Sequence, residues 1–343
     1  MRKVAMYSVI FVLSGCSGVL YWAAMHEPFF RRLENSGFIT DMYQYGDLYT
    51  STHLPSFREA TAIDTLIPLF TPTEKDTQLS LYLEGDSYTQ LSRMSAAQVR
   101  AGTYQYQFNS RADTLNRSKK NILIVERTER YFRLHVQDAK QKKNRPPMQA
   151  LENFLLQNPQ PDWFNTKQIN DRLQYLMGNN RFGNMIQELK AQLNYSLFGI
   201  TGQTVVVSER HHQVYLAETL NPGSLLSPYC PLTTQESEDI IEYLNDLYDE
   251  KKSYGFDAVY FSLIPDKIRV YPIGSDSLNT LFQLMKNPRL RMPILSCEDT
   301  LMQASEPIFI CSDTHWNRLG LNRWLALLDQ LLKKQTMLSV PAR

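Results

Sequence analysis

The sequence predicts an α/β fold with a mostly parallel central sheet. Short, strand-like runs of apolar residues alternate along the chain with longer segments whose apolar residues recur at helical spacing. In addition, the run from Ile122 to Val125 is apolar without interruption, as is typical of strands buried on both faces of a parallel sheet. No internal repeat and no low-complexity tract breaks the alternation.

The first predicted strand ends at Gly85. Leu79, Leu81 and Leu83 alternate with polar or amphipathic neighbours before that glycine. After it, residues 88–102 have the composition of a helix, which we expect to stop near the glycine at its end. The continuous apolar run described above gives the second strand.

Residues from about 138 to 202 depart from this alternation and predict a helical insertion or cap on the core. A basic linker that ends in prolines occupies residues 139–147, and helices rich in polar and aromatic residues follow at 166–177 and 183–199. Two short apolar runs separated by SERHH then predict a β-hairpin within residues 204–216.

The last third of the chain returns to alternating helices and strands. Thr233 and Glu236 have capping-box spacing at the start of an amphipathic helix, which Gly255 ends. AVYFSLIPDK predicts a strand that runs into Pro265, and PIFICSDTHWN predicts another that ends near Ser312. GLNRWLALLDQLLKK closes the chain as an amphipathic helix.

The overall composition is that of a globular protein with a real core. Hydrophobic residues make up 43% of the 343 residues and charged residues 21%. This length allows two average domains or one large α/β domain with insertions. The net charge of +1 argues against a nucleic-acid surface spread over the protein, so no nucleic-acid partner is predicted.

The N-terminal segment predicts a membrane anchor. Residues 4–25 form a stretch of 22 residues without a charge, and about 20 apolar residues suffice to cross a bilayer. Arg2 and Lys3 favour a cytoplasmic N-terminus, and Tyr21 and Trp22 suit the far membrane interface. We therefore expect the rest of the chain to lie outside the cytoplasm, on the periplasmic face.

A second interpretation of the same segment remains. LSGC, which ends at Cys16, resembles the bacterial lipobox, so the mature protein would be a lipoprotein lipidated at Cys16. The apolar run continues past that cysteine, which favours an uncleaved anchor; a buried core helix is less favoured because the run has no polar face. The predicted organisation is residues 1–28 as anchor or signal segment, 29–75 as an irregular lead-in without a sheet strand, and 76–343 as the α/β domain.

The remaining cysteines and the paired histidines do not predict a metal site. Cys230, Cys297 and Cys311 form no CxxC pair and no zinc pattern, which leaves one disulfide and three buried thiols as open alternatives. His211 and His212 lack an evident third ligand, so a solvated hairpin turn is favoured.

Three residues predict nucleophilic catalysis. Ser87 follows the first strand, and Asp313 and His315 follow the last predicted strand. If these strands run parallel, all three side chains lie at the same edge of the sheet. A nucleophilic serine needs a base within hydrogen-bond reach and a third group that orients the base. Taken by itself, each motif has a simpler interpretation. Gly-Asp-Ser is common in turns, and a histidine beside Trp316 is commonly a structural residue.

The motifs carry a resemblance to known families. GDSY, residues 85–88, resembles the first block of the SGNH (GDSL) hydrolases. DTHWN, followed by Gly320, resembles the Asp-x-His-Trp motif of the alginate O-acetyltransferase family, which comprises periplasmic SGNH-like proteins that acetylate exopolysaccharides. VERTER at 125–130 and LIPDKIRVYP at 263–272 are similar to further blocks of that family. The resemblance implies an SGNH-hydrolase-like three-layer sandwich.

Two features depart from these families. The hydrolases have Asp-x-x-His, whereas the spacing here is the Asp-x-His of the acetyltransferases, in which that block precedes the serine. The serine comes first in this chain, which indicates a circularly permuted relative; geometry and not order defines a triad. The glycine and asparagine oxyanion blocks of the hydrolases are not identifiable.

The resemblance implies a role for each residue. His315 would take the proton of Ser87, which would accept an acyl group, while Asp313 would hold the imidazole. Asp86 would be a turn residue or a cap. The candidate substrate-binding residues are Arg127, Arg130, Trp316, Lys267 and Tyr88. For the two arginines, an exposed ion pair with a neighbouring glutamate is an equally good interpretation. Lys267 could instead form an ion pair within its loop, and Trp316 could instead pack under the last helix.

The expected function is O-acetylation of a polysaccharide outside the cytoplasm, through an acyl-serine intermediate. No cofactor is predicted. Because acetyl-CoA is cytoplasmic, a membrane-bound acyl-donor protein would supply the acyl group, a partner inferred from the family. The alternatives are a glycan acetyl esterase with the same triad and a catalytically inactive glycan-binding or assembly protein.

Overall fold

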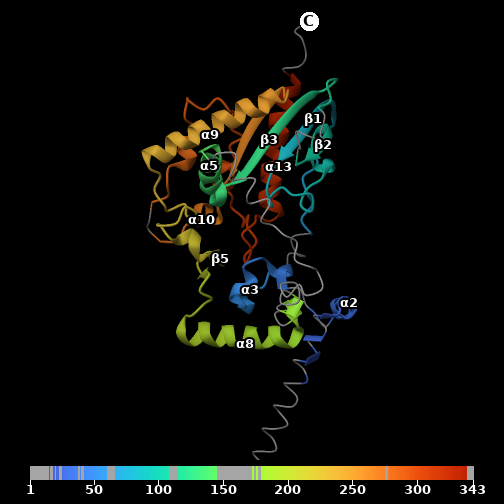
Figure 1. The fold of residues 1–343 in the computed structure, drawn as a ribbon, viewed down its shortest axis with the longest axis vertical. Coiled ribbons are helices and arrows are strands. Elements are labelled where there is room, and N and C mark those ends of the chain that lie inside the picture. The colour runs from blue at the N-terminus through green and yellow to red at the C-terminus, as the bar shows by residue number, and fades with distance from the viewer. Residues whose placement is uncertain are drawn as a thin grey trace, which may run out of the picture. The chain divides into compact units, whose positions relative to one another are not determined.

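The computed structural model is drawn as a ribbon in Figure 1. The residues that it describes are 15, 18–19, 21–22, 25–37, 39, 42–59, 66–107, 115–144, 172–173, 175–176, 179–274 and 277–337. The chain forms two compact units. The first comprises Met1–Gln44, Thr52–Ser56 and Arg145–Thr201, and the second comprises Tyr45–Ser51, Phe57–Asn144 and Gly202–Arg343.

The predicted membrane anchor falls mostly outside the described residues. Most of residues 4–25, including Cys16, belong to the part of the chain that the structure leaves undescribed. Among the residues that are described, no helix is both long and apolar enough to cross a membrane.

The second unit is built on a four-stranded sheet with the order β2-β1-β3-β6. Every neighbouring pair of strands in this sheet runs parallel, so the predicted α/β fold with a parallel sheet is confirmed. The strands are β1 (Asp76–Glu84), β2 (Ala101–Tyr106), β3 (Lys120–Thr128) and β6 (Ala258–Ile264).

Helices cover both faces of this sheet. Alternate residues of β3 belong to two separate hydrophobic clusters, which explains why its apolar run is uninterrupted. Ile122 and Ile124 pack in the cluster that includes Trp324 of α13 (Arg318–Met337). Leu123 and Val125 pack in the cluster formed with α5 (Glu129–Asn144) and α9 (Thr234–Ser253), which lie on the other face (Figure 1).

Several predicted elements form as expected. The hairpin consists of β4 (Val205–Ser208) and β5 (Gln213–Leu216), which pair antiparallel. Helix α9 begins with a capping box in which the Thr233 hydroxyl accepts from the Glu236 backbone N–H at 3.1 Å. The closing helix is α13, and the helix predicted at residues 183–199 is α8 (Arg181–Phe198).

The helix predicted after the first strand is wrong. Residues 88–100 form turns and a single 3₁₀ turn, η3 (Ala96–Gln98), before the chain enters β2. Gly102 therefore lies inside a strand, where a Cβ would come within 2.7 Å of the Thr77 Cα on β1. The glycine permits close pairing of two strands and does not end a helix.

The strand predicted to end near Ser312 does not form either. Phe309 makes only an isolated antiparallel bridge with Trp316, and the Ile310 backbone N–H donates to the His315 carbonyl at 3.2 Å. The chain thus folds back on itself in a loop, because these local bonds replace the pairing that a fifth strand of the sheet would need.

The predicted basic linker is also wrong over its first part, since residues 139–144 continue helix α5. Lys140 forms an ion pair with Asp239 of α9 at 2.6 Å, which fixes this end of the helix. The rest of the linker, and most of the helix predicted at 166–177, lie outside the described residues.

The remaining elements are short. The lead-in residues 42–57 contain helical turns and no strand, as predicted. The short elements are α2 (Glu27–Asn35), η1 (Met42–Tyr45), α3 (Tyr49–Thr52), η2 (Pro55–Phe57), η5 (Ala217–Leu220), α10 (Lys267–Val270), α11 (Leu281–Leu284) and α12 (Glu298–Met302).

Candidate active site

Ser87 lies in a turn directly after β1, and its side chain is exposed. Asp86 fixes this turn. One of its carboxylate oxygens accepts from the Tyr88 backbone N–H at 3.1 Å, and the other accepts from the Thr128 backbone N–H at the end of β3, also at 3.1 Å. Asp86 is therefore a turn residue, as the sequence indicated, and it ties the serine to the neighbouring strand.

A buried carboxyl group, that of Glu126, also forms hydrogen bonds to this turn. Glu126 of β3 accepts from the Asp86 backbone N–H at 3.1 Å and from the Thr89 hydroxyl at 2.8 Å. Burial, and then the charge of Asp86, raise the pKa of Glu126 well above its usual range. At Gly85 a Cβ would lie 2.3 Å from the Thr89 hydroxyl, so this packing requires glycine.

The loop after Phe309 brings a histidine to the serine. The His315 Nε2 lies 2.7 Å from the Ser87 Oγ, and the His315 Nδ1 lies 2.6 Å from the Asp313 Oδ1. Because a carboxylate only accepts hydrogen bonds, Nδ1 carries the proton in this arrangement and Nε2 accepts from the serine hydroxyl. The structure thus brings together the three residues that the sequence predicted.

Asp313 is held in its charged form. Burial alone would raise its pKa, but the hydrogen bond and the charge of His315 outweigh burial and hold the pKa of Asp313 well below its usual range. The same carboxylate also accepts from the His315 backbone N–H at 2.9 Å. These two bonds fix both the tautomer and the direction of the imidazole.

A second carboxylate, Asp47, stands behind this loop, and sequence reasoning missed it. Its backbone N–H donates to Asp313 at 3.3 Å, and its side chain accepts from the backbone N–H and the hydroxyl of Thr314 at 2.7 and 2.5 Å. Burial, and then the charge of Asp313, raise the pKa of Asp47. Asp47 therefore orients the loop that carries the histidine.

The sequence feature that could have indicated a role for Asp47 is the Gly-Asp pair at residues 46–47, in a segment without a strand pattern. Gly46 has a φ of 110°, which favours glycine, and a Cβ there would lie 2.3 Å from the Ser312 carbonyl oxygen. The close approach of backbone to backbone places Asp47 beside the loop. The rest of the lead-in, which the sequence predicts as irregular, gives no further indication of this contact.

Tyr88 and Trp316, two predicted substrate-binding residues, are buried behind the triad. Trp316 has no exposed surface, and its indole N–H donates to the Tyr88 carbonyl at 3.0 Å. The Tyr88 hydroxyl donates to the Thr314 carbonyl, and its ring centroid lies 4.9 Å from that of His315. In this structure neither aromatic ring offers a face to a sugar, and both position the histidine loop.

The two predicted arginines have different surroundings. Arg127 forms an ion pair with Glu84 at 2.5 Å and is thus engaged within the fold. Arg130 is 6% exposed, and its Nε has no hydrogen-bond partner among the described residues. It lines a cavity of about 10 Å³ together with Thr314 and Lys267, about the smallest volume that holds one water molecule.

Lys267 is buried and supports the loop from beneath. Its ammonium donates to the carbonyl groups of Val214, Ile310 and Cys311 at 3.1, 2.8 and 3.1 Å. Burial lowers the pKa of Lys267 to about 8, so the group is still charged at neutral pH. It connects β5 to the start of the histidine loop, and only 3% of its surface is exposed.

We expect Lys267→Met to lower the free energy of unfolding by about 3 kcal/mol at pH 7, because three buried carbonyl groups lose their donor. The unfolded chain, with a lysine pKa near 10.5, binds more protons than the folded chain between pH 8 and 10.5. The stability of the wild type relative to the variant should therefore increase with pH across that window. Urea unfolding at pH 7, 9 and 10 measures this.

The exposed lysine Lys286, whose side chain makes no closer polar contact among the described residues than an ion pair with Glu298 at 3.7 Å, provides the matched control. Lys286→Met should leave stability nearly unchanged at each pH. A stability difference between wild type and Lys267→Met that stays constant from pH 7 to 10 would contradict the assignment.

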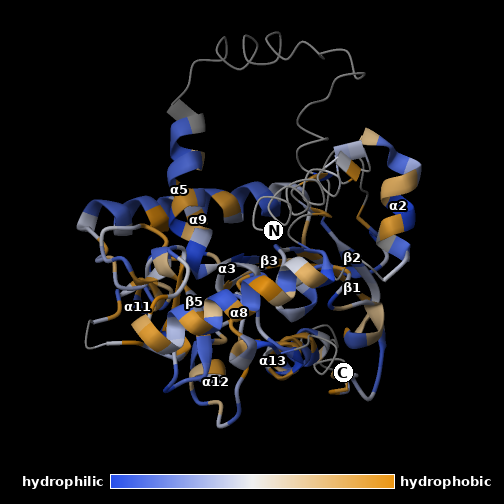
Figure 2. Cartoon of the chain, turned by 90° about the horizontal axis from the view of Figure 1, so that it is seen from below, coloured by the Kyte–Doolittle hydropathy of each residue, from blue (hydrophilic) through white to orange (hydrophobic). Residues whose placement is uncertain are grey.

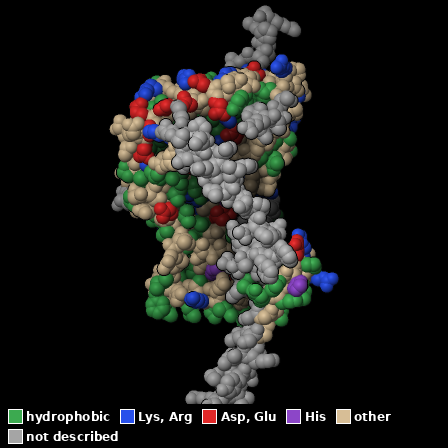
Figure 3. Space-filling view, viewed as in Figure 1, with side chains coloured by type: hydrophobic (Ala, Val, Ile, Leu, Met, Phe, Trp, Pro, Cys, Tyr) green, Lys and Arg blue, Asp and Glu red, His purple; other side chains and the backbone are tan. Residues whose placement is uncertain are grey.

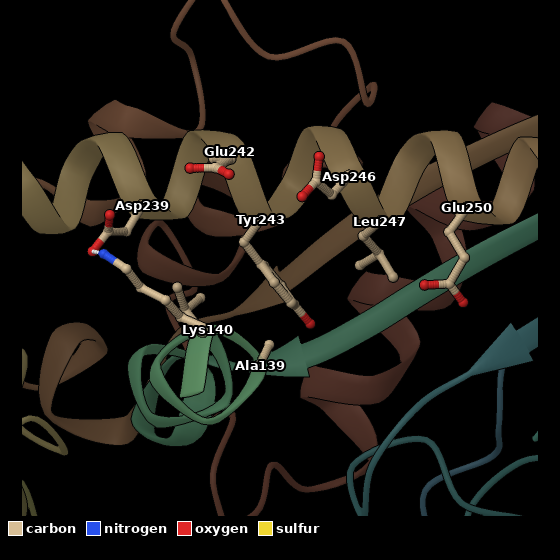
Figure 4. A pocket seen from close by; sticks show the side chains of 9 residues that line it. Ala139, Lys140, Asp239, Glu242, Tyr243, Asp246, Leu247 and Glu250 are labelled. Carbon is tan, nitrogen blue, oxygen red and sulfur yellow. Dashed lines mark hydrogen bonds and ion pairs between the residues drawn. The ribbon is translucent and has the colours of Figure 1, made fainter. Parts of the chain in front are cut away.

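Other candidate features lie apart from the triad. A pocket of about 290 Å³ lies between α5 and α9. Figure 4 shows the side chains that line it, among them Tyr243 and the Lys140–Asp239 ion pair. None of the predicted site residues lines it. Among the described residues Cys230, Cys297 and Cys311 form no disulfide; Cys297 and Cys311 are buried, as one of the two alternatives expected, whereas Cys230 is only partly buried.

One group of potential metal ligands involves the triad itself. Asp47, Asp313 and His315 offer ligand atoms within 4.8 Å of one another. The Nδ1 of His315 and the carboxylate of Asp313 are hydrogen-bonded to each other. This arrangement is typical of a histidine that is oriented by an acid. Of the two paired histidines, His212 stacks on Phe57 with ring centroids 4.9 Å apart.

Comparison of the chain with protein-family models, with curated proteins and with solved structures finds no match.

Proposed function

We propose that this chain is a serine-dependent O-acetyltransferase that acts on a polysaccharide outside the cytoplasm. The observation that carries the proposal is the hydrogen-bonded series Ser87, His315 and Asp313, with distances of 2.7 and 2.6 Å. The placement of the serine at the carboxyl end of a parallel strand also supports an SGNH-like fold.

The geometry supports a two-step acyl transfer. His315 takes the hydroxyl proton of Ser87 as the serine oxygen attacks the carbonyl carbon of the acyl donor, and the donor's leaving group departs with that proton. The acceptor hydroxyl then loses its proton to His315 and attacks the acyl-serine, which restores the serine hydroxyl. Asp313 stabilises the imidazolium that forms in each step.

The backbone N–H of Ser87 is the first candidate for the oxyanion donor. It makes no hydrogen bond to any described residue, and it belongs to the residue whose oxygen attacks. The proposal includes a membrane-bound protein that supplies the acyl group, because a site outside the cytoplasm has no access to acetyl-CoA. It also includes attachment through the N-terminal segment, either as an anchor or by lipidation of Cys16.

Exposure of Ser87 favours a second candidate, an acetyl esterase that removes acetyl groups from a glycan. Water reaches an exposed acyl-serine as readily as a sugar hydroxyl does. The two functions differ only in the acceptor of the acyl group.

The test uses the full chain in nanodiscs with p-nitrophenyl acetate as donor and acetyl-free alginate or cellulose oligosaccharides as acceptors. The transferase proposal expects acetylated oligosaccharide by mass spectrometry, in excess of a reaction without protein. Release of acetate alone, unaffected by acceptor, favours the esterase. A folded protein that does neither contradicts both and leaves a glycan-binding or assembly role.

A further inference from the structure

Helix α8 of the first unit exposes an apolar face. Six of its exposed large hydrophobic side chains, between 48% and 68% exposed, lie on one side of the helix: Phe182, Met185, Ile186, Leu189, Leu193 and Leu197. A seventh, Phe198, is 69% exposed at the C-terminal end of the helix and lies outside this group. We call these six residues the apolar stripe. At about 100° of rotation per residue they fall within an arc of about 120° on the helix. Figure 2 shows the hydrophobic residues along α8, and Figure 3 shows hydrophobic side chains gathered over the same helix.

Apart from Phe198 at its end, the other side of α8 is mostly polar and less exposed. Asn184 is buried, and Gln187, Glu188 and Asn194 are partly buried. The charge of Glu188 acts on His53 of the same unit. A surface helix of a soluble protein has the opposite arrangement, with its apolar side covered and its polar side in water. The sequence of α8 therefore fits an environment that is itself apolar.

Two cations border the apolar stripe. Arg181 and Lys190 are both exposed, and rotation by about 100° per residue places one on each side of the arc. Long cationic side chains can lay their methylene groups along an apolar surface while their charged ends reach lipid phosphates. Helices with this combination lie in the plane of a membrane interface.

The start of α8 is held close to the end of the predicted anchor. Asn180, which caps α8, makes an isolated β-bridge with Ile39. Just before it, Leu173, Tyr175 and Leu176 pack in one cluster with the apolar residues of α2, which begins at Glu27. The uncharged N-terminal stretch ends at residue 25, two residues before α2. Both elements belong to the same compact unit.

We propose that α8 lies in the interface of the bilayer that the N-terminal segment reaches, with the apolar stripe among the acyl chains. Arg181 and Lys190 then meet the phosphates of anionic phospholipids. The proposal concerns attachment to the membrane and does not depend on the chemistry of Ser87. It adds a second contact with lipid to the predicted anchor.

The test reconstitutes the full chain into vesicles of phosphatidylethanolamine and phosphatidylglycerol, with the photoreactive amino acid p-benzoylphenylalanine in place of Leu189. After irradiation, mass spectrometry of the α8 peptide should show phospholipid adducts. The matched control carries the same photoreactive residue in place of Phe198, which is 69% exposed on the same helix but lies on the side opposite the apolar stripe, and should give none. Circular dichroism confirms that each protein is folded.

Adducts at both positions, or at neither, would overturn the proposal.

The same irradiation in native membranes tests whether something other than lipid covers the apolar stripe. Cross-links from position 189 to another protein, to a second copy or to a different segment of this chain, in place of lipid, would also overturn it. Adding Met185→Glu and Leu193→Glu to the probe protein should remove most of the lipid adduct, and an undiminished adduct counts against it.

Discussion

Ser87→Ala is expected to abolish the formation of an acetyl-enzyme and to lower acyl transfer by about 10⁴-fold or more. The serine oxygen is the only group placed at 2.7 Å from the His315 Nε2 among the described residues, so no other hydroxyl can replace it. Intact-mass spectrometry after incubation with an activated acetyl ester measures this directly. The wild type should gain one acetyl group and the variant none.

A serine elsewhere on the surface provides the control for that experiment. Ser118 is exposed in a turn and bonds only within that turn. Ser118→Ala should retain the acetyl-enzyme and full activity. An acetyl group that persists in Ser87→Ala would place the nucleophile elsewhere.

Asp313→Asn is expected to lower acyl transfer by about 10⁴-fold, because an amide no longer fixes the His315 tautomer or stabilises the imidazolium. The variant should nevertheless fold, since the amide oxygen can still accept from the His315 backbone N–H, and only the longer bond from the Asp47 backbone N–H is lost. Steady-state hydrolysis of p-nitrophenyl acetate measures the loss.

Asp47→Asn is the matched comparison, since Asp47 also lies near the imidazole, 4.0 Å from Nδ1. Its carboxylate bonds to Thr314 and not to the ring, so the expected loss is only about tenfold. Equal losses in the two variants would show that the two acids share the role given to Asp313.

The fold was predictable where periodicity was strong. The apolar run at Ile122, the capping box at Thr233 and the closing helix all gave elements close to those expected. Prediction failed where short-range patterns fitted two structures. β2 was missed because its six residues lack a clear alternation and follow a segment of good helix formers.

The site was predictable in part because its central residues follow recognisable motifs. Ser87 and His315 were found from short motifs, but the supporting contacts depend on tertiary structure. Asp47 bonds to Asp313, which is 266 residues away in sequence, and Lys267 bonds to the backbone of Ile310, which is 43 residues away. No local sequence pattern indicates contacts over such separations. Likewise, the burial of Trp316 follows from the loop that replaced the predicted fifth strand.

The serine and its histidine come from opposite ends of the second unit, 228 residues apart in sequence. During synthesis the serine is therefore made long before its base, and a chain that stops short of residue 315 carries a nucleophile with nothing to activate it. If the chain has the proposed function, acyl transfer therefore begins only after the C-terminal part has folded back onto β1 and brought His315 to Ser87.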